Sequence, residues 1–118
     1  MIRRLSDLVP QAGENLRGGR GRGHSQVFFQ RGEFSTPLTA FNVLTLDPGA
    51  SVGRHQHVGS EEVYWVLEGT GLAEDDDRGV ELKVGDALLT GDGHWHSIQN
   101  PGPGPLRILT VLSEKSRP

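Results

Sequence analysis

The stretch Gly49–Gly69, with the sequence GASVGRHQHVGSEEVYWVLEG, decides the fold. It holds two histidines, His55 and His57, in a run that is typical of a β-strand. Successive side chains of a strand point to opposite faces, so these two project from the same face, about 6 to 7 Å apart along the backbone. Two imidazoles on one face can bind the same metal ion.

A carboxylate follows these histidines across a short turn. Residues 58–60 form the predicted turn, and the run Glu61–Glu68, rich in Val, Tyr, Trp and Leu, predicts a returning strand. Alternation places Glu62 beside the histidines and Glu61 on the opposite face. A lone histidine pair in a strand is more often a partly exposed polar pair than a metal site. The prediction of a metal site therefore depends on further ligands such as Glu62.

A second segment supplies another histidine. The sequence Gly85–Asn100, GDALLTGDGHWHSIQN, places His96 at the start of a further predicted strand. The predicted ligands are three imidazoles and one carboxylate: His55, His57, Glu62 and His96. This donor set suits manganese, iron, nickel, copper, cobalt or zinc. We expect one divalent transition metal per chain, and we favour manganese or iron because a six-coordinate ion leaves two positions for a ligand.

At these residues the chain resembles the cupin superfamily. The first cupin motif, G(x5)HxH(x4)E(x6)G, is matched in spacing by Gly49, His55, His57, Glu62 and Gly69. The second, G(x5)PxG(x2)H(x3)N, is matched by Gly85, Gly93, His96 and Asn100, and Gly91 stands where the family usually has proline. The resemblance implies an all-β fold, the cupin double-stranded β-helix, which is a jelly-roll barrel of antiparallel strands. It also implies similarity to small single-domain metal-binding cupins (monocupins), some of them oxalate-binding or oxalate-decarboxylase-like.

Residues 25–118 form the predicted barrel, and residues 1–24 form a short N-terminal arm. Strands separated by turn residues are predicted over 26–30, 38–46, 51–57, 62–68, 70–74, 80–84, 87–90, 95–99 and 106–113. In the arm, residues 2–9 fit either one helical turn or an added edge strand. The Gly/Arg-rich sequence LRGGRGRG, residues 16–23, predicts a surface or intersubunit loop. The resemblance leaves a role for this loop near the pocket open, and RNA binding is a distant alternative.

Two further residues are candidates for catalysis. Tyr64 shares the predicted face of Glu62, and alternation likewise places Ser51 and Gly53 on the face of His55. His94 lies two residues before His96. It is a candidate for an acid or base at the rim of the pocket, and the alternative is a solvent-facing histidine in the turn. No cofactor is expected beyond the metal.

Composition limits the remaining possibilities. A chain of 118 residues fits one domain, and its lack of cysteine excludes disulfides and thiolate metal sites and fits the cytoplasm. No apolar run approaches the ~20 residues that span a bilayer, so no membrane partner is expected. The first 31 residues carry a net charge of +4, and the remainder carries −7 of the total of −3. This asymmetry, together with a hydrophobic fraction of 34%, predicts a homodimer.

Two functions remain open from the sequence. One is a metal-dependent enzyme, a decarboxylase, dioxygenase or isomerase, acting on a small carboxylate, oxo acid or enediol that chelates the metal. The alternative is a non-catalytic module that binds or senses a sugar or an acid. The sequence contains no helix-turn-helix segment that would accompany a sensor, which favours the enzyme.

Overall fold

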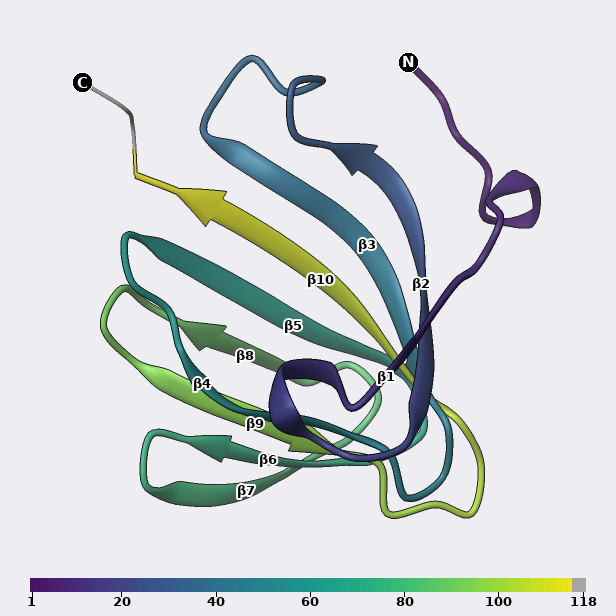
Figure 1. The fold of residues 1–118 in the computed structure, drawn as a ribbon, viewed down its shortest axis with the longest axis vertical. Helices are drawn as coiled ribbons and strands as arrows, with labels where there is room; N and C mark the ends of the chain where they lie inside the picture. The colour runs from purple at the N-terminus through teal and green to yellow at the C-terminus, as the bar shows by residue number, and fades with distance from the viewer. Residues whose placement is uncertain (116–118) are drawn as a thin grey trace.

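Two antiparallel β-sheets face each other in the computed structural model, which describes residues 1–115 (Figure 1). The strands are β1 Gln11–Glu14, β2 Arg22–Gln30, β3 Leu38–Leu46, β4 Ser51–Gln56, β5 Ser60–Glu68, β6 Gly71–Asp75, β7 Arg78–Leu82, β8 Ala87–Thr90, β9 Trp95–Gln99 and β10 Leu106–Glu114. Two 3-10 turns flank β1, η1 Leu5–Asp7 and η2 Leu16–Gly18. Every predicted strand is present, and the all-β prediction is confirmed. Within residues 1–115, the structure contains no helix long and apolar enough to cross a membrane.

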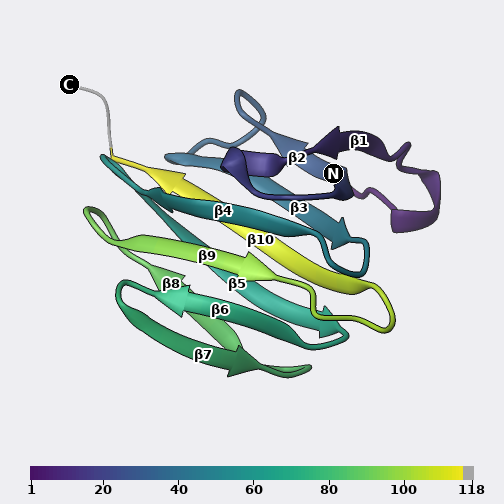
Figure 2. The same cartoon turned by 60° about the horizontal axis from the view of Figure 1, so that its bottom comes forward.

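Neighbouring strands are often far apart in the sequence. One sheet has the order β1-β2-β3-β10-β5-β8, and the other has the order β4-β9-β6-β7 (Figure 2). The chain therefore crosses repeatedly from one sheet to the other, which is the jelly-roll arrangement that the resemblance implied. Strands β4 and β5, joined by one short turn, lie in different sheets, so side chains from the two can meet between them.

The core lies between the sheets. Its most deeply buried apolar side chains, each at most 1% exposed, are Leu46, Ala50, Val66, Ile98, Leu106 and Ile108. In β3 the sequence did not decide which of two alternating sets faces inward. Leu44 and Leu46 join the core, so Asn42 shares the inner face. The outward set is Phe41, Val43 and Thr45.

Two motif residues hold an end of the barrel rather than the metal cluster. The Asn100 Nδ2 donates to the carbonyl oxygens of Leu46 and Gly104, both at 2.9 Å. Gly69 has a φ of +81°, and a Cβ atom there would overlap the carbonyl oxygen of Pro105. These residues connect the turn before β10 to the ends of β3 and β5, which explains why their residue types are needed.

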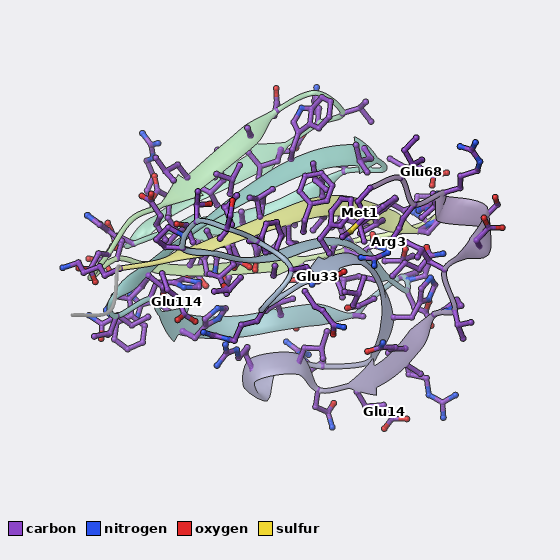
Figure 3. All side chains as sticks on the ribbon, turned by 90° about the horizontal axis from the view of Figure 1, so that it is seen from above. Met1, Arg3, Glu14, Glu33, Glu68 and Glu114 are labelled. Carbon is purple, nitrogen blue, oxygen red and sulfur yellow. The ribbon has the colours of Figure 1, made fainter. Side chains whose placement is uncertain are left out.

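The N-terminal arm is more ordered than the sequence predicted. Residues 2–9 contain the helical turn η1, and β1 pairs with β2 at the edge of the larger sheet. Arg3 donates to the carbonyl oxygen of Phe28 at 2.8 Å and pairs with Glu33 (Figure 3). Because β2 begins at Arg22, the predicted loop at 16–23 is shorter than expected. Whether residues 1–24 are separable from the barrel stays a prediction.

Candidate metal centre

Three histidine rings meet between the sheets because their strands are paired. His55 of β4 is the antiparallel partner of His96 of β9, and His57 directly follows β4. The Nε2 atom of His96 lies 3.0 Å from that of His55 and 3.1 Å from that of His57. The backbone supports this arrangement, because the amide of His57 donates to the carbonyl oxygen of His94 at 3.0 Å.

The carboxylate comes from the opposite sheet. The Glu62 Oε1 atom lies 3.2 Å from His57 Nε2 and 3.4 Å from His96 Nε2. The ligand atoms of the four predicted residues all lie within 4.8 Å of one another. The neighbouring Glu61 is exposed, as strand alternation predicts. The four residues together form a cluster that is compatible with a divalent metal site.

A backbone carbonyl fixes the hydrogen on one of the rings. The Nδ1 of His55 donates to the carbonyl oxygen of Gly53 at 2.7 Å. A carbonyl oxygen only accepts, so the hydrogen of the neutral ring is on Nδ1. The Nε2 of His55 therefore presents its lone pair to the centre of the cluster.

The other two rings have hydroxyl partners, which the sequence analysis missed. The Nδ1 of His57 lies 3.0 Å from Ser60 Oγ, and the Nδ1 of His96 lies 2.7 Å from Thr90 Oγ1. Partners of this kind orient a ligating imidazole and set its tautomer. Thr90 is 0% exposed and shares a strand face with the buried Leu88. This spacing of two residues is the one sequence signal that points to Thr90.

Burial favours the neutral form of His55 and His57. His57 and His96 expose only 5% and 0% of their surface. Burial is the main cause that lowers the pKa of His55 and of His57 below the usual histidine value. For His57 the nearby carboxylate of Glu62 opposes this effect without reversing it. Because neutral imidazole is the form that binds a metal, a lowered pKa in His55 and His57 favours metal binding.

The donor spacing fits a single ion. With metal–ligand bonds of about 2.1 Å, adjacent donors are separated by about 3.0 Å around an octahedral ion and about 3.4 Å around a tetrahedral one. Four of the six separations between these donors run from 3.0 to 3.4 Å, and every pair lies within 4.8 Å. Lone pairs that face each other at this distance repel, and a cation between them removes the repulsion. The residues present therefore fit a bound divalent metal.

Tyr64 lies against this cluster, on the face predicted from Glu62. Its ring stacks on that of His96 with centroids 4.6 Å apart and an interplanar angle of 16°. Its hydroxyl lies 3.4 Å from His96 Nε2. Burial, assisted by the negative charge of Glu62, raises the pKa of Tyr64 well above its usual value of 10. The phenol stays protonated and is available as a hydrogen-bond donor.

One unpaired acceptor shares the inner face with Tyr64. Asn42 of β3 pairs in register with Thr110 of β10, which pairs in turn with Tyr64. Within residues 1–115, the Asn42 Oδ1 atom is buried and has no hydrogen-bond partner. A buried acceptor normally has a partner, so this atom is free to accept a hydrogen bond from a ligand or a water.

His94 does not join the cluster. Its Nδ1 donates to Asp76 Oδ2 at 2.6 Å, and its side chain is 58% exposed. The hydrogen bond and the negative charge of Asp76 raise the pKa of His94. Strand β9 begins one residue later, so the alternation that would align His94 with His96 does not apply. The structure thus places His94 in the solvent-facing turn that was one of its two predicted positions.

The alternation expected in β4 is also interrupted. The pairing of β4 with β9 is irregular between Val52 and His55. Val52 is 5% exposed and belongs to the core, although alternation would place it opposite His55. Ser51 and Gly53, predicted beside the histidine, instead contact residues 17–20 of the N-terminal loop.

Comparison with known proteins is consistent with this geometry. The cupin domain model matches residues 42–112, more than half of the chain. The chain is 35% identical to the oxalate-binding protein of Thermotoga maritima over 112 residues, which cover 95% of this chain and 93% of that protein. The crystal structure of a predicted oxalate decarboxylase from the same organism superposes with a TM-score of 0.93, at 34% identity, over 97% of this chain and 99% of that chain.

A more distant structure has the same fold. The crystal structure of a sugar phosphate isomerase of the cupin superfamily from Silicibacter pomeroyi is 24% identical, with a TM-score of 0.77 over 95% of this chain and 74% of that chain. The segment matched by the family model contains both histidine motifs, and the nearly full-length relatives share the whole fold. This chain therefore belongs to the cupin family.

Proposed function

We propose that this chain binds one divalent transition metal, with manganese or iron favoured, and that it is an enzyme acting on a small substrate chelated to that metal. The proposed ligands are His55, His57, Glu62 and His96. The observation that carries the proposal is the convergence of three Nε2 atoms and one carboxylate oxygen while each Nδ1 is held by the protein. Such a metal supplies a Lewis acid that polarises a bound oxygen, or holds dioxygen beside the substrate.

The proposed substrate is oxygen-rich: a carboxylate, an oxo acid or an enediol. The 35% identity to an oxalate-binding protein over 95% of this chain supports a small chelating acid as the substrate. The chain's own residues would act around it. Thr90 keeps His96 in position, and Tyr64, protonated at neutral pH, donates a hydrogen bond to an oxygen of Glu62 or of the substrate. The reaction would be of the decarboxylase, dioxygenase or isomerase type.

Elemental analysis of protein purified without a metal-affinity column tests the metal. We expect about one ion per chain in the wild type and a strong loss in Glu62→Gln. The matched control is Glu61→Gln, because this adjacent carboxylate is exposed on the other face. His96→Gln and the exposed His94→Gln form a second pair. Equal metal content in Glu62→Gln and Glu61→Gln would contradict the proposed ligand set.

Turnover is tested separately. Metal-loaded protein is incubated with oxalate, 2-oxo acids, hydroxy acids and enediols, with and without oxygen, and the products are measured. We expect a product with one of these classes and its loss in Glu62→Gln. Product formation that persists in this variant would contradict metal-dependent catalysis.

A second candidate is a non-catalytic binding protein. It is favoured by the similarity to the oxalate-binding protein of Thermotoga maritima, and by the cluster itself. Among residues 1–115, the cluster contains a single carboxylate, Glu62, which is a proposed ligand, while Glu61 faces outward. No second carboxylate is thus in place as an acid or base. This candidate predicts measurable affinity for an acid that is recovered unchanged.

We also propose that two copies associate through the outer face of the larger sheet. Register partners on this face are apolar: Phe41, Val111, Val63 and Leu89 in one row, and Leu109, Trp65 and Ala87 beside the already buried Val43 in the next. Leu89 and Trp65 are 61% and 42% exposed. A standard interface needs about 800 Å² per partner, about a ninth of the surface of 6982 Å². The opposite charges of the N-terminal segment and the body would add attraction between two copies.

Sedimentation of the wild type and of Leu89→Asp tests this association. We expect a dimer that becomes a monomer in the variant, and an unchanged dimer in the control Leu72→Asp, because Leu72 is 42% exposed on the other sheet. A monomeric wild type would refute the homodimer. A cytoplasmic location, proposed from the lack of cysteine, is tested by cell fractionation.

A further inference from the structure

The chain crosses between the two sheets twice beside the metal cluster. Residues 58–60 lead from β4 in the smaller sheet to β5 in the larger one, and residues 91–94 lead from β8 in the larger sheet to β9 in the smaller one. The views in Figures 1 and 2 both place these two connections near the end of β10. His57 and Glu62 flank the first connection, and His96 follows the second, so each connection is next to proposed metal ligands.

The turn at residues 58–60 is not held by its own flanking strands. Because β4 and β5 belong to different sheets, no hairpin ladder joins them, and the backbone of the turn needs hydrogen-bond partners elsewhere in the chain. Side-chain packing contributes little here. Val58 is 76% exposed, and a Cβ atom on Gly59 would meet nothing within 4 Å. Hydrogen bonds from other segments must therefore fix the turn.

The carboxylate of Asp92 supplies the central one of these hydrogen bonds. Its Oδ1 accepts the amide hydrogen of Gly59 at 2.6 Å. Its Oδ2 lies 2.6 Å from Lys115 Nζ, and the amide of Lys115 donates to the carbonyl oxygen of Gly59 at 2.9 Å. Both backbone groups of Gly59 are thus held. Asp92 links the turn to the second connection and to the end of β10.

Backbone hydrogen bonds extend this link to a proposed ligand. The amide of Gly93 donates to the carbonyl oxygen of His57 at 2.6 Å, and the amide of His57 donates to that of His94 at 3.0 Å. Within the turn, Ser60 Oγ lies 3.0 Å from His57 Nδ1. A displacement of the turn would therefore disturb the partners of His57 and its distance to the carboxylate ligand of the other sheet.

We propose that Asp92 is a positioning residue for the metal site, because its hydrogen bond to Gly59 keeps the ligands of the two sheets together before the metal binds. This inference rests on the proposed function. Without this carboxylate the turn would open in a fraction of the molecules, and only molecules with a closed turn would present His57 and Glu62 to one ion. The apparent Kd for the metal rises as the closed fraction falls.

Competition with a fluorescent chelator tests Asp92 on the full chain, with manganese as the probe. In Asp92→Ala we expect the Kd for manganese to rise about 3- to 10-fold, the range for the loss of one partly exposed hydrogen bond. Asp92→Asn keeps an oxygen that accepts the amide hydrogen of Gly59, so its Kd should stay within about twofold of the wild type.

The matched control is Asp86→Ala. The Oδ2 of Asp86 accepts the amide hydrogen of Lys83 at 2.8 Å in the turn that precedes β8, at the other end of that strand from Asp92. This variant also removes a carboxylate that holds a turn, so it should affect stability in a similar way and leave the Kd for manganese unchanged. Equal losses of affinity in Asp92→Ala and Asp86→Ala would overturn the proposal.

Amide hydrogen exchange of the metal-free protein tests the same hydrogen bond without a metal. A Kd that rises 3- to 10-fold corresponds to a closed fraction of about one third to one tenth, so the amides of His57 and Gly93 should lose most of their protection in Asp92→Ala. Unchanged exchange or an unchanged Kd in this variant would overturn the proposal, and so would an Asp92→Asn that behaves like Asp92→Ala. A wild type that binds no divalent metal would instead refute the proposed function, and the exchange measurement would still decide whether Asp92 holds the turn.

Discussion

The hydroxyl of Thr90 should control both stability and metal affinity. Thr90 and His96 are each 0% exposed, and their side chains are 2.7 Å apart. In Thr90→Val the methyl group nearly fills the volume of the hydroxyl, so no cavity forms. The Nδ1 of His96 then lacks its partner, and a buried unpaired polar atom costs about 1 to 3 kcal/mol. Loss of an outer partner of a ligating histidine also lowers metal affinity by about 10- to 100-fold.

Thr45→Val is the matched control. Thr45 is also buried, at 6% exposure, but its Oγ1 atom has no hydrogen-bond partner within residues 1–115. Valine there removes an unsatisfied hydroxyl, so the free energy of unfolding should stay the same or rise by up to about 1 kcal/mol. Urea unfolding of the metal-free proteins measures stability, and competition with a fluorescent chelator measures manganese affinity. Manganese affinity within twofold of wild type in Thr90→Val would refute the assigned role of this hydroxyl.

Three other measurements follow from the structure. Gly53→Ala should destabilise the protein by about 1 to 3 kcal/mol, because the added methyl group meets backbone atoms of residues 17–19. The control Gly79→Ala should not destabilise it, because no atom lies within 4 Å of the added methyl group. Equal urea midpoints for the two variants would count against this packing. Burial lowers the pKa of His55 and His57, so just below pH ~6.5 these two residues bind more protons in the unfolded chain than in the folded apoprotein. In His94→Gln, which removes the histidine whose raised pKa has the opposite effect, the free energy of unfolding should therefore fall as the pH drops through this window. A pH-independent value between 7.5 and 5 would contradict this. Adding manganese at about 1,000 times its Kd should stabilise the fold by about 4 kcal/mol, and calorimetry showing no rise in Tm would argue against binding to the folded state.

The cluster was predictable because its geometry is local. His55 lies in β4, His57 directly follows this strand, and Glu62 comes after a short turn in β5, so extended-chain alternation sets their faces. Glu61 against Glu62 illustrates this, since one residue of offset separates an exposed side chain from a member of the cluster. The resemblance to cupins supplied the pairing of β4 with β9, which brings His96 to His55 and which no local pattern contains.

The residues that support the cluster were not predictable, because their positions depend on strand pairing and not on a local pattern. Thr90 reaches His96 because β8 pairs with β5, where Thr90 lies opposite Glu62, and such pairing is decided by the whole sheet. Strand β1 has the sequence QAGE, without apolar alternation, so only its partner β2 makes it a strand. The irregular pairing in β4 is likewise invisible in a pattern that assumes strict alternation. Because of it, Ser51 and Gly53 contact residues 17–20 and do not line the site.

The small apolar core and the polar cluster are two consequences of one arrangement. Between the sheets, His57, Thr90 and His96 occupy positions that a larger apolar core would otherwise fill. Buried polar groups of this kind stabilise little by themselves, since each hydrogen bond within the protein replaces one with water. An ion bound by β4 and β9 in one sheet and by β5 in the other would link the two layers directly. The interior would then be stabilised by ligand binding where apolar contacts are few, which couples the stability of this fold to occupancy of the proposed site.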